Sequence, residues 1–228
     1  MKKQDVLLIL ICALLLLPFF LFDAVYNTYS NLNTNHGILM AFIKFAILST
    51  LGECIGLRIK SGSYSYPGFG ILPRALVWGF LGMWIAASMK IFGAGAPRFA
   101  EYIGINGVVD AMGGSFSGLK FVGAFLISLA MNTSFGPVFM TLHKVTDTHI
   151  INTGGTLRGF FKPIDVAGIL SSLNWKVQWN FVFKKTIPFF WIPAHTLTFL
   201  LPPNLQVLFA ALLGVALGLI LAIAGQKK

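Results

Sequence analysis

Six long apolar segments, separated by shorter polar stretches, dominate the pattern along the chain. They run over residues 6–22, 37–57, 74–94, 120–142, 179–201 and 205–225. Each holds roughly 20 residues, enough for an α-helix to cross a hydrocarbon core of about 30 Å. The pattern predicts an all-α, polytopic transmembrane helix bundle of about six spans, with residues 1–228 forming a single integral membrane domain.

The fifth segment differs from the others because Lys184 and Lys185 interrupt it and Pro188 and Pro193 lie inside it. Proline removes a backbone hydrogen bond and bends a helix, so we predict a kinked fifth helix. Before it, residues 163–170, together with the tryptophans that follow them, predict a short interfacial helix at an aromatic belt. The glycine-rich stretch 95–118 is predicted to be an external connection.

The first segment follows Met1-Lys2-Lys3, a basic start that secretory signals share with membrane helices. The apolar run is long for a signal, and no clear small-x-small cleavage site follows it. We interpret this segment as a retained first helix, and a cleaved signal is the alternative.

Composition excludes soluble classes of protein. Hydrophobic residues make up 56% of the chain and charged residues 11%, against about 25% charged residues in a soluble domain. The net charge of +10 is explained by basic residues in loops on one side, which predicts that both termini are cytoplasmic. No basic run exceeds two residues, so we expect no nucleic-acid partner.

Polar residues inside the second segment are functional candidates, because burying ionisable groups in lipid is costly. Glu53 shares a helix face with Ser49 and Thr50. This face predicts a polar seam, and the alternative is that Glu53 lies near the inner interface and reaches toward Arg58. Gly52 and Gly56 form a GxxxG pattern typical of close helix packing, and Gly214 and Gly218 repeat it in the sixth segment.

The fifth segment carries a second polar pattern. Lys184, Pro188, Trp191, His195 and Thr198 follow one another at intervals of three or four residues, which places them on one face of an α-helix. In the fourth segment, Asn132 adds an amide at membrane depth. These residues predict a pore lining or solute path, and the alternative is a packed face of the bundle.

Catalytic and metal-binding patterns are absent from the sequence. It contains no HExxH, Walker or GxSxG motif, its four histidines have no metal-ligand spacing, and its two cysteines lie in apolar segments. We therefore expect no catalytic residue, no metal, no cofactor and no enzymatic activity.

Four local patterns suggest a family resemblance. The longest follows the order W-P-x-x-Q-x-x-N-F-x-x-V-P-x-x-x-R with small shifts, and comprises Trp191, Pro193, His195, Thr198, Phe199, Leu201, Pro202 and Gln206. The others are Asn132 with Pro137 and Phe139, the pair Gly52-Glu53, and Arg74 before Trp78, Gly79, Gly82 and Trp84. Over about residues 37–225 the chain resembles the Mpv-seventeen and peroxisomal membrane protein family. At four positions this chain carries another residue than the family pattern: His195 stands in place of Gln, Thr198 in place of Asn, Gln206 in place of Arg and Met131 in place of Asp.

The resemblance implies a channel-like membrane protein that passes small solutes without a cofactor. The alternative function is a non-catalytic structural or assembly protein of the membrane. Expected partners are membrane lipid and small-molecule solutes, and a homo-oligomer is left open. The basic start followed at once by an apolar helix favours a bacterial plasma membrane, with the mitochondrial inner or peroxisomal membrane as the alternative.

Overall fold

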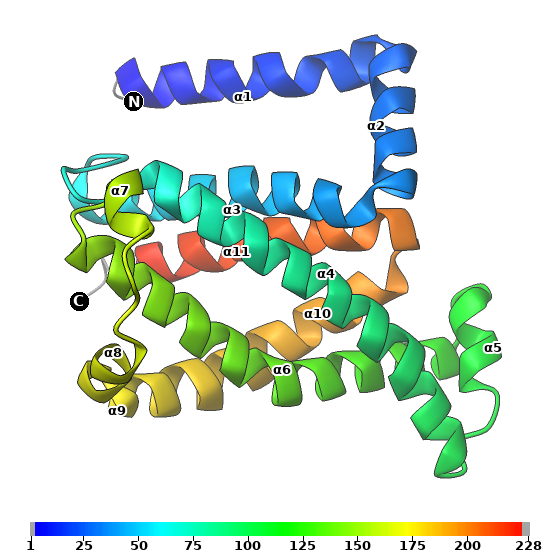
Figure 1. Cartoon of the computed structure of the whole chain (residues 1–228). Helices are drawn as coiled ribbons and strands as arrows, with labels where there is room; N and C mark the ends of the chain where they lie inside the picture. Colours follow the sequence, from blue (N-terminus) through cyan, green and yellow to red (C-terminus); the bar gives the residue numbers. More distant parts are fainter. Residues whose placement is uncertain (1–2, 225–228) are drawn as a thin grey trace. The chain divides into compact units, whose positions relative to one another are not determined.

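The computed structural model describes residues 3–224, except for the side chains of Leu221 and Ala224. Helices make up nearly all of this part of the chain, and it contains no strand, which confirms the all-α prediction. The chain divides into two compact units, Met1–Met40 and Ala41–Lys228; we call the second the main unit (Figure 1).

The first unit contains α1 (Lys3–Leu21), α2 (Asp23–Asn35) and the start of α3. None of the α1 side chains is buried. A leucine-rich helix that is apolar all round is suited to contact with lipid. An edge-to-face contact between the rings of Phe19 and Tyr29, with centroids 5.5 Å apart, joins α1 to α2.

Within residues 3–224, five helices are long and apolar enough to cross a membrane, and this supports an integral membrane protein. They are α1, α3 (Gly37–Ser61), α4 (Ile71–Tyr102), α6 (Gly118–Asn152) and α11 (Pro203–Ala224). The remaining predicted segment is divided between a π-helix, η1 (Gln178–Trp191), and α10 (Ile192–Leu200), which follow each other without a break. The arrangement agrees with a bundle of about six spans.

The connection predicted at 95–118 is largely helical. Helix α4 continues to Tyr102, with Pro97 inside it, and α5 (Val108–Gly113) follows. Glycine weakens a helix by only about 1 kcal/mol per residue, and Gly93 and Gly95 are accommodated within α4. At 1.5 Å per residue, the 32 residues of α4 extend about 48 Å, which is longer than the hydrocarbon core.

The predicted interfacial helix corresponds to α8 (Val166–Ser172), which lies between the short helices α7 (Leu157–Phe160) and α9 (Trp175–Val177). The Asp165 carboxylate caps α8 by accepting a hydrogen bond from the Gly168 amide at 2.9 Å. The Trp175 indole donates to the Leu170 carbonyl at 2.9 Å. These hydrogen bonds stabilise the start of α8 and the turn that follows it.

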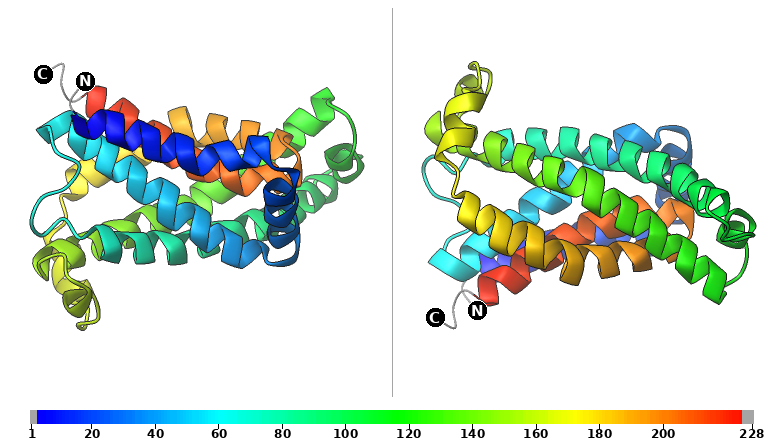
Figure 2. Two further views of the ribbon diagram at one scale, coloured as in Figure 1. Left: turned by 90° about the horizontal axis from the view of Figure 1, so that it is seen from above. Right: turned by 90° about the horizontal axis from the view of Figure 1, so that it is seen from below.

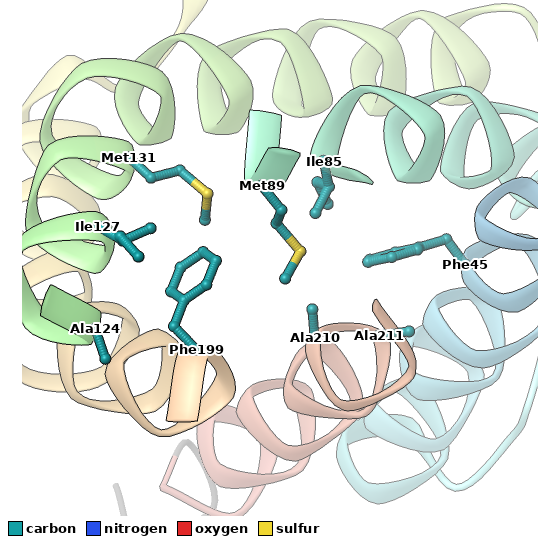
Figure 3. Packing of buried hydrophobic residues seen from close by; sticks show 9 residues of the cluster. All are labelled: Phe45, Ile85, Met89, Ala124, Ile127, Met131, Phe199, Ala210 and Ala211. Atoms are coloured by element: carbon teal, nitrogen blue, oxygen red, sulfur yellow. The ribbon is translucent and has the colours of Figure 1, made fainter. Parts of the chain in front are cut away.

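Within the main unit, the helices pack side by side (Figures 1 and 2) around a main apolar core, and a smaller buried cluster of Val77, Leu81 and Ile150 joins α4 to α6. The main core draws on α3, α4, α6, α10 and α11, and its buried cluster consists of Phe45, Ile85, Met89, Ala124, Ile127, Met131, Phe199, Ala210 and Ala211 (Figure 3). Gly79 and Gly82 let the rings of Phe42 and Phe45 lie directly against α4, since a Cβ at either glycine would collide with them. The end of α3, the start of α4 and the end of α6 meet at the end of the bundle that carries α7–α9 (Figure 1).

Candidate functional site

The main unit contains a partly open cavity of about 350 Å³ between α3, α4, α6, η1, α10 and α11. Most of its wall is apolar or aromatic, with Phe45, Trp78, Ile85, Met131, Phe135, Phe139, Met140, Phe181, Val182, Ala210 and Leu217. Its polar side chains are Ser49, Glu53, Asn132, His143, Lys144, Gln178, Thr186, Trp191 and His195. A volume of this size is at the lower end of small-molecule binding sites.

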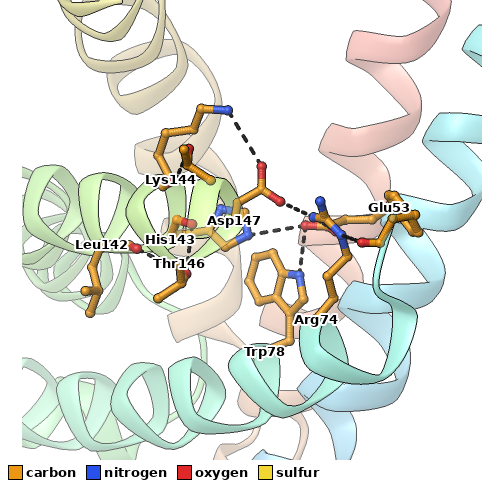
Figure 4. A network of polar contacts seen from close by, with 10 residues as sticks. Glu53, Arg74, Trp78, Leu142, His143, Lys144, Thr146 and Asp147 are labelled. Carbon is orange, nitrogen blue, oxygen red and sulfur yellow. Dashed lines mark hydrogen bonds and ion pairs between the residues drawn. The ribbon is translucent and has the colours of Figure 1, made fainter. Parts of the chain in front are cut away.

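A group of ionisable side chains, which we call the charge cluster, consists of Glu53, Arg74, His143, Lys144 and Asp147 (Figure 4). Three of them, Glu53, His143 and Lys144, line the cavity. Arg74 Nη1 lies 2.6 Å from Glu53 Oε2 and also pairs with the Asp147 carboxylate. The other Glu53 oxygen lies 3.2 Å from His143 Nε2 and accepts a hydrogen bond from the Trp78 indole at 3.0 Å. Lys144 Nζ lies 3.6 Å from Asp147 Oδ2.

Local backbone geometry positions Arg74. Its Nε donates to the Phe69 carbonyl at 2.7 Å, and its guanidinium lies 4.3 Å from the centroid of the Phe69 ring. Gly70 precedes α4 with φ +73°, and a Cβ there would lie 2.9 Å from the Cα of Gly155. Only glycine combines this φ with such a close approach, so the turn fixes the direction in which α4 leaves it.

A second polar contact joins α6 to α10 near the middle of the bundle, where these helices run side by side (Figure 2). Nδ1 of His195 lies 3.0 Å from the side-chain amide nitrogen of Asn132 and 3.2 Å from its amide oxygen. The Ser128 hydroxyl donates to the Ile192 carbonyl at 2.8 Å. All three polar side chains are buried. Lipid has no groups that could hydrogen-bond to them, so these contacts within the protein supply their partners.

Three buried polar atoms of the cavity residues have no hydrogen-bond partner within the described chain. They are Ser49 Oγ, Gln178 Nε2 and Trp191 Nε1. Unsatisfied buried donors are rare in native structures because each costs about 1–3 kcal/mol. Each of these atoms is almost wholly enclosed by the surrounding chain, with Ser49 on α3 and Gln178 and Trp191 at opposite ends of η1.

The structure brings together some of the residues predicted to line a pore. Ser49, Glu53, Asn132, Trp191 and His195 all lie in the cavity wall, although they come from three different parts of the chain. Glu53 contacts Arg74, Trp78 and His143, which favours the polar seam over the alternative of reaching toward Arg58. Whether these residues line a conducting path stays a prediction.

Three other predicted residues do not lie in the wall. Lys184 is exposed on η1, and Thr198 is fully buried, with its hydroxyl bonded to the Ala194 carbonyl at 2.9 Å. Thr50 is buried outside the wall. The single stripe from Lys184 to Thr198 was wrong because it assumed α-helical turns, whereas residues 178–191 form the wider turns of a π-helix.

The glycines predicted for helix packing lie against one another. A Cβ at Gly52 would lie 2.9 Å from the Cα of Val215, and one at Gly56 would lie 3.6 Å from the Gly218 carbonyl oxygen. A Cβ at Gly218 would lie 3.5 Å from the Gly52 oxygen, and one at Gly214 would lie 3.6 Å from Ser49 Oγ. The two GxxxG patterns therefore form one interface between α3 and α11.

Sequence reasoning missed His143, Asp147 and Gln178. A signal for the first two was present, because His143 and Asp147 are four residues apart near the end of α6 and share a helix face. Gln178 had no such signal, since it begins a π-helix after the short α9. Within residues 3–224, no group of three or more His, Cys, Asp or Glu side chains could hold a metal ion.

The arrangement is chemically suited to binding a molecule inside the bundle. Two carboxylates are balanced by Arg74 and Lys144, and an aromatic wall adjoins them.

Comparisons with known proteins returned no matching family model, curated protein or solved structure. The resemblance to the Mpv-seventeen and peroxisomal membrane protein family accordingly stays a prediction.

Proposed function

We propose that the protein is an integral membrane channel or pore for small solutes. One observation carries the proposal: a cavity of about 350 Å³ lies among membrane-length helices and has polar side chains in its wall. Protein interiors are normally packed with few voids larger than a water molecule. Polar groups at membrane depth are costly and are typical of solute pathways.

Orientation follows from the basic residues. In the main unit, the end of the bundle with α7–α9 also carries Arg58, Lys60, Arg74, Lys144, Arg158, Lys162 and Lys176. Because lysine and arginine are in excess on cytoplasmic loops, we propose that this end of the main unit faces the cytoplasm. We also propose that both termini are cytoplasmic and that the membrane is a bacterial plasma membrane. Reporter fusions after Lys60 and at the C-terminus should then read as cytoplasmic and a fusion at Asn33 as external; an external C-terminus would contradict the orientation.

Solute flux through purified protein in liposomes tests the function. We expect glycerol to enter proteoliposomes faster than protein-free liposomes, measured by stopped-flow light scattering. Met140 lies in the cavity wall, so Met140→Trp should slow this entry by filling the cavity. Val138 is 58% exposed on the same helix, and Val138→Trp is the matched control that should leave entry unchanged.

Two outcomes would contradict the proposal. If neither glycerol nor sucrose crosses faster than in protein-free liposomes, while the protein is folded, the protein is not a pore and the assembly role becomes the better explanation. If both tryptophan variants slow entry equally, the solute path does not run through the cavity.

A further inference from the structure

The stretch from α7 to the first turns of η1, residues 157–185, carries a strong excess of positive charge. Its basic side chains are all exposed and are Arg158, Lys162, Lys176, Lys184 and Lys185, whereas Asp165 is its one acidic residue. The Asp165 carboxylate accepts a hydrogen bond from the Gly168 amide at 2.9 Å, so it is held at the start of α8. We call this stretch the basic segment.

The positive charge of the basic segment is not neutralised by the protein itself. Within residues 3–224, none of its five basic side chains forms a salt bridge. The charge cluster at the same end of the bundle differs in this respect, since Lys144 and Arg74 both contact carboxylates. The basic segment therefore presents cations that can attract an anion from outside the protein.

Exposed aromatic side chains lie among these cations. Phe161, Trp175 and Trp179 are exposed, as is the apolar Val177. Tryptophan is enriched where a membrane meets water, because its ring is apolar and its N–H is polar. The Trp175 N–H donates to the Leu170 carbonyl at 2.9 Å, so this ring is already ordered within the segment. An acidic protein would need the cations alone, whereas a lipid headgroup with its adjoining hydrocarbon fits both kinds of side chain.

The direction of Lys184 supports the same partner. Its Nζ lies 6.0 Å from the centroid of the Trp179 ring, five residues earlier in η1. The side chain therefore extends back toward α9 and the end of the bundle. Lysines near the end of a membrane helix adopt this direction when their apolar stem lies along hydrocarbon and their ammonium reaches the headgroups.

The position of the basic segment in the fold places it beside the membrane surface. It joins α6, which is long and apolar enough to cross a membrane, to η1 and α10 of the bundle. Helices α7–α9 lie at one end of the bundle (Figure 1). We infer that the basic segment binds the headgroups of anionic phospholipids in the adjacent leaflet, with its lysines at the phosphates and its exposed rings among the upper acyl chains. This surface lies outside the cavity, so the inference does not depend on the proposed pore.

Competition between two phospholipids tests the inference. The full-length protein is reconstituted into nanodiscs that contain phosphatidylglycerol, which is anionic, and phosphatidylcholine, which has no net charge, in equal amounts and with the same acyl chains. Native mass spectrometry then counts the lipids that stay on the protein after its gentle release. We expect phosphatidylglycerol to be retained over phosphatidylcholine by about tenfold, since each basic side chain near an anionic headgroup strengthens binding by roughly fivefold.

Charge variants link this preference to the basic segment. Lys176→Gln combined with Lys184→Gln should lower the retention ratio by about fivefold. Lys162→Gln combined with Lys185→Gln should lower it likewise, and this second pair keeps the test decisive if the first fails to fold. Lys90 and Arg98 are exposed on α4, outside the segment, so Lys90→Gln combined with Arg98→Gln is the matched control that should leave the ratio unchanged.

Three results would overturn the inference. Equal retention of the two lipids would exclude anionic lipid and leave an acidic protein as the better partner. An equal loss of preference in the control pair would mean that overall charge, not this surface, selects the lipid. Displacement of phosphatidylglycerol by an excess of inorganic phosphate at constant ionic strength would identify a site for the free ion. Glycerol entry is measured separately, so the pore and the lipid surface fail independently.

Discussion

Arg74 and Glu53 form an ion pair with 2.6 Å between Nη1 and Oε2, and this contact ties the start of α4 to the C-terminal half of α3. The same guanidinium pairs with Asp147, so it also reaches α6. Three helices that are distant in the sequence are thus joined by one side chain, of which only 7% is exposed. Removal of the Arg74 guanidinium would leave the largely buried carboxylates of Glu53 and Asp147 without their main partner.

We expect Arg74→Gln to destabilise the bundle by about 3 kcal/mol, because breaking a buried pair leaves uncompensated charge. Adding Glu53→Gln should recover part of this loss, since one stranded charge is removed. Lys144 is 51% exposed, and Lys144→Gln is the control expected to cost less than about 1 kcal/mol. Unfolding in detergent with increasing denaturant measures these free energies; equal losses for Arg74→Gln and Lys144→Gln would contradict the role given to Arg74.

The contact between α3 and α11 gives a second prediction. A Cβ at Gly52 would lie 2.9 Å from backbone Cα of Val215, whereas one at Gly56 would lie 3.6 Å from the Gly218 carbonyl oxygen. Gly52→Ala therefore forces the helices apart and should cost about 1–3 kcal/mol. Gly56→Ala meets only an ordinary contact and should be near neutral, while the larger side chain in Gly56→Leu should be destabilising. Thermal unfolding in detergent compares the stabilities of the three variants. If Gly52→Ala leaves the stability unchanged, α11 can move away from α3 at little cost, and the predicted role of Gly52 is contradicted.

The sequence predicted the number, location and packing stripes of the long helices because apolar length and small-residue spacing are local signals. It also indicated Glu53, Asn132 and His195, since polar groups at membrane depth stand out against apolar neighbours. It did not predict η1, because residues 178–191 carry no local pattern that distinguishes a π-helix from an α-helix. Gln178 and the partners of Arg74 depend on contacts between distant segments, which spacing within one helix cannot indicate.

The contact between Asn132 and His195 should stabilise the packing of α6 against α10. Both side chains are buried, and their closest atoms lie 3.0 Å apart. Hydrogen bonds between membrane helices contribute about 0.6 kcal/mol on average and up to about 1.7 kcal/mol. A double-mutant cycle of Asn132→Ala and His195→Ala should give a coupling energy within this range. A coupling energy of zero would show that the two side chains do not bond to each other in the membrane.

Cysteine reactivity along η1 and α10 tests which residues face the cavity. Trp191 and His195 lie in its wall, whereas Lys184 is exposed on the outside of the bundle and Leu197 is 56% exposed toward the surroundings. In a background without Cys12 and Cys54, single cysteines at positions 191 and 195 should react with a small polar thiol reagent.

The remaining positions supply the controls. Thr198 is fully buried outside the wall, so a cysteine there should not react. A cysteine at position 197 faces lipid, where thiols stay protonated and polar reagents are scarce, and it should also remain unmodified. Reaction at 198 together with 184, 191 and 195 would restore the single α-helical stripe expected from residue spacing, and would mean that η1 does not form its π-helical turns in the membrane.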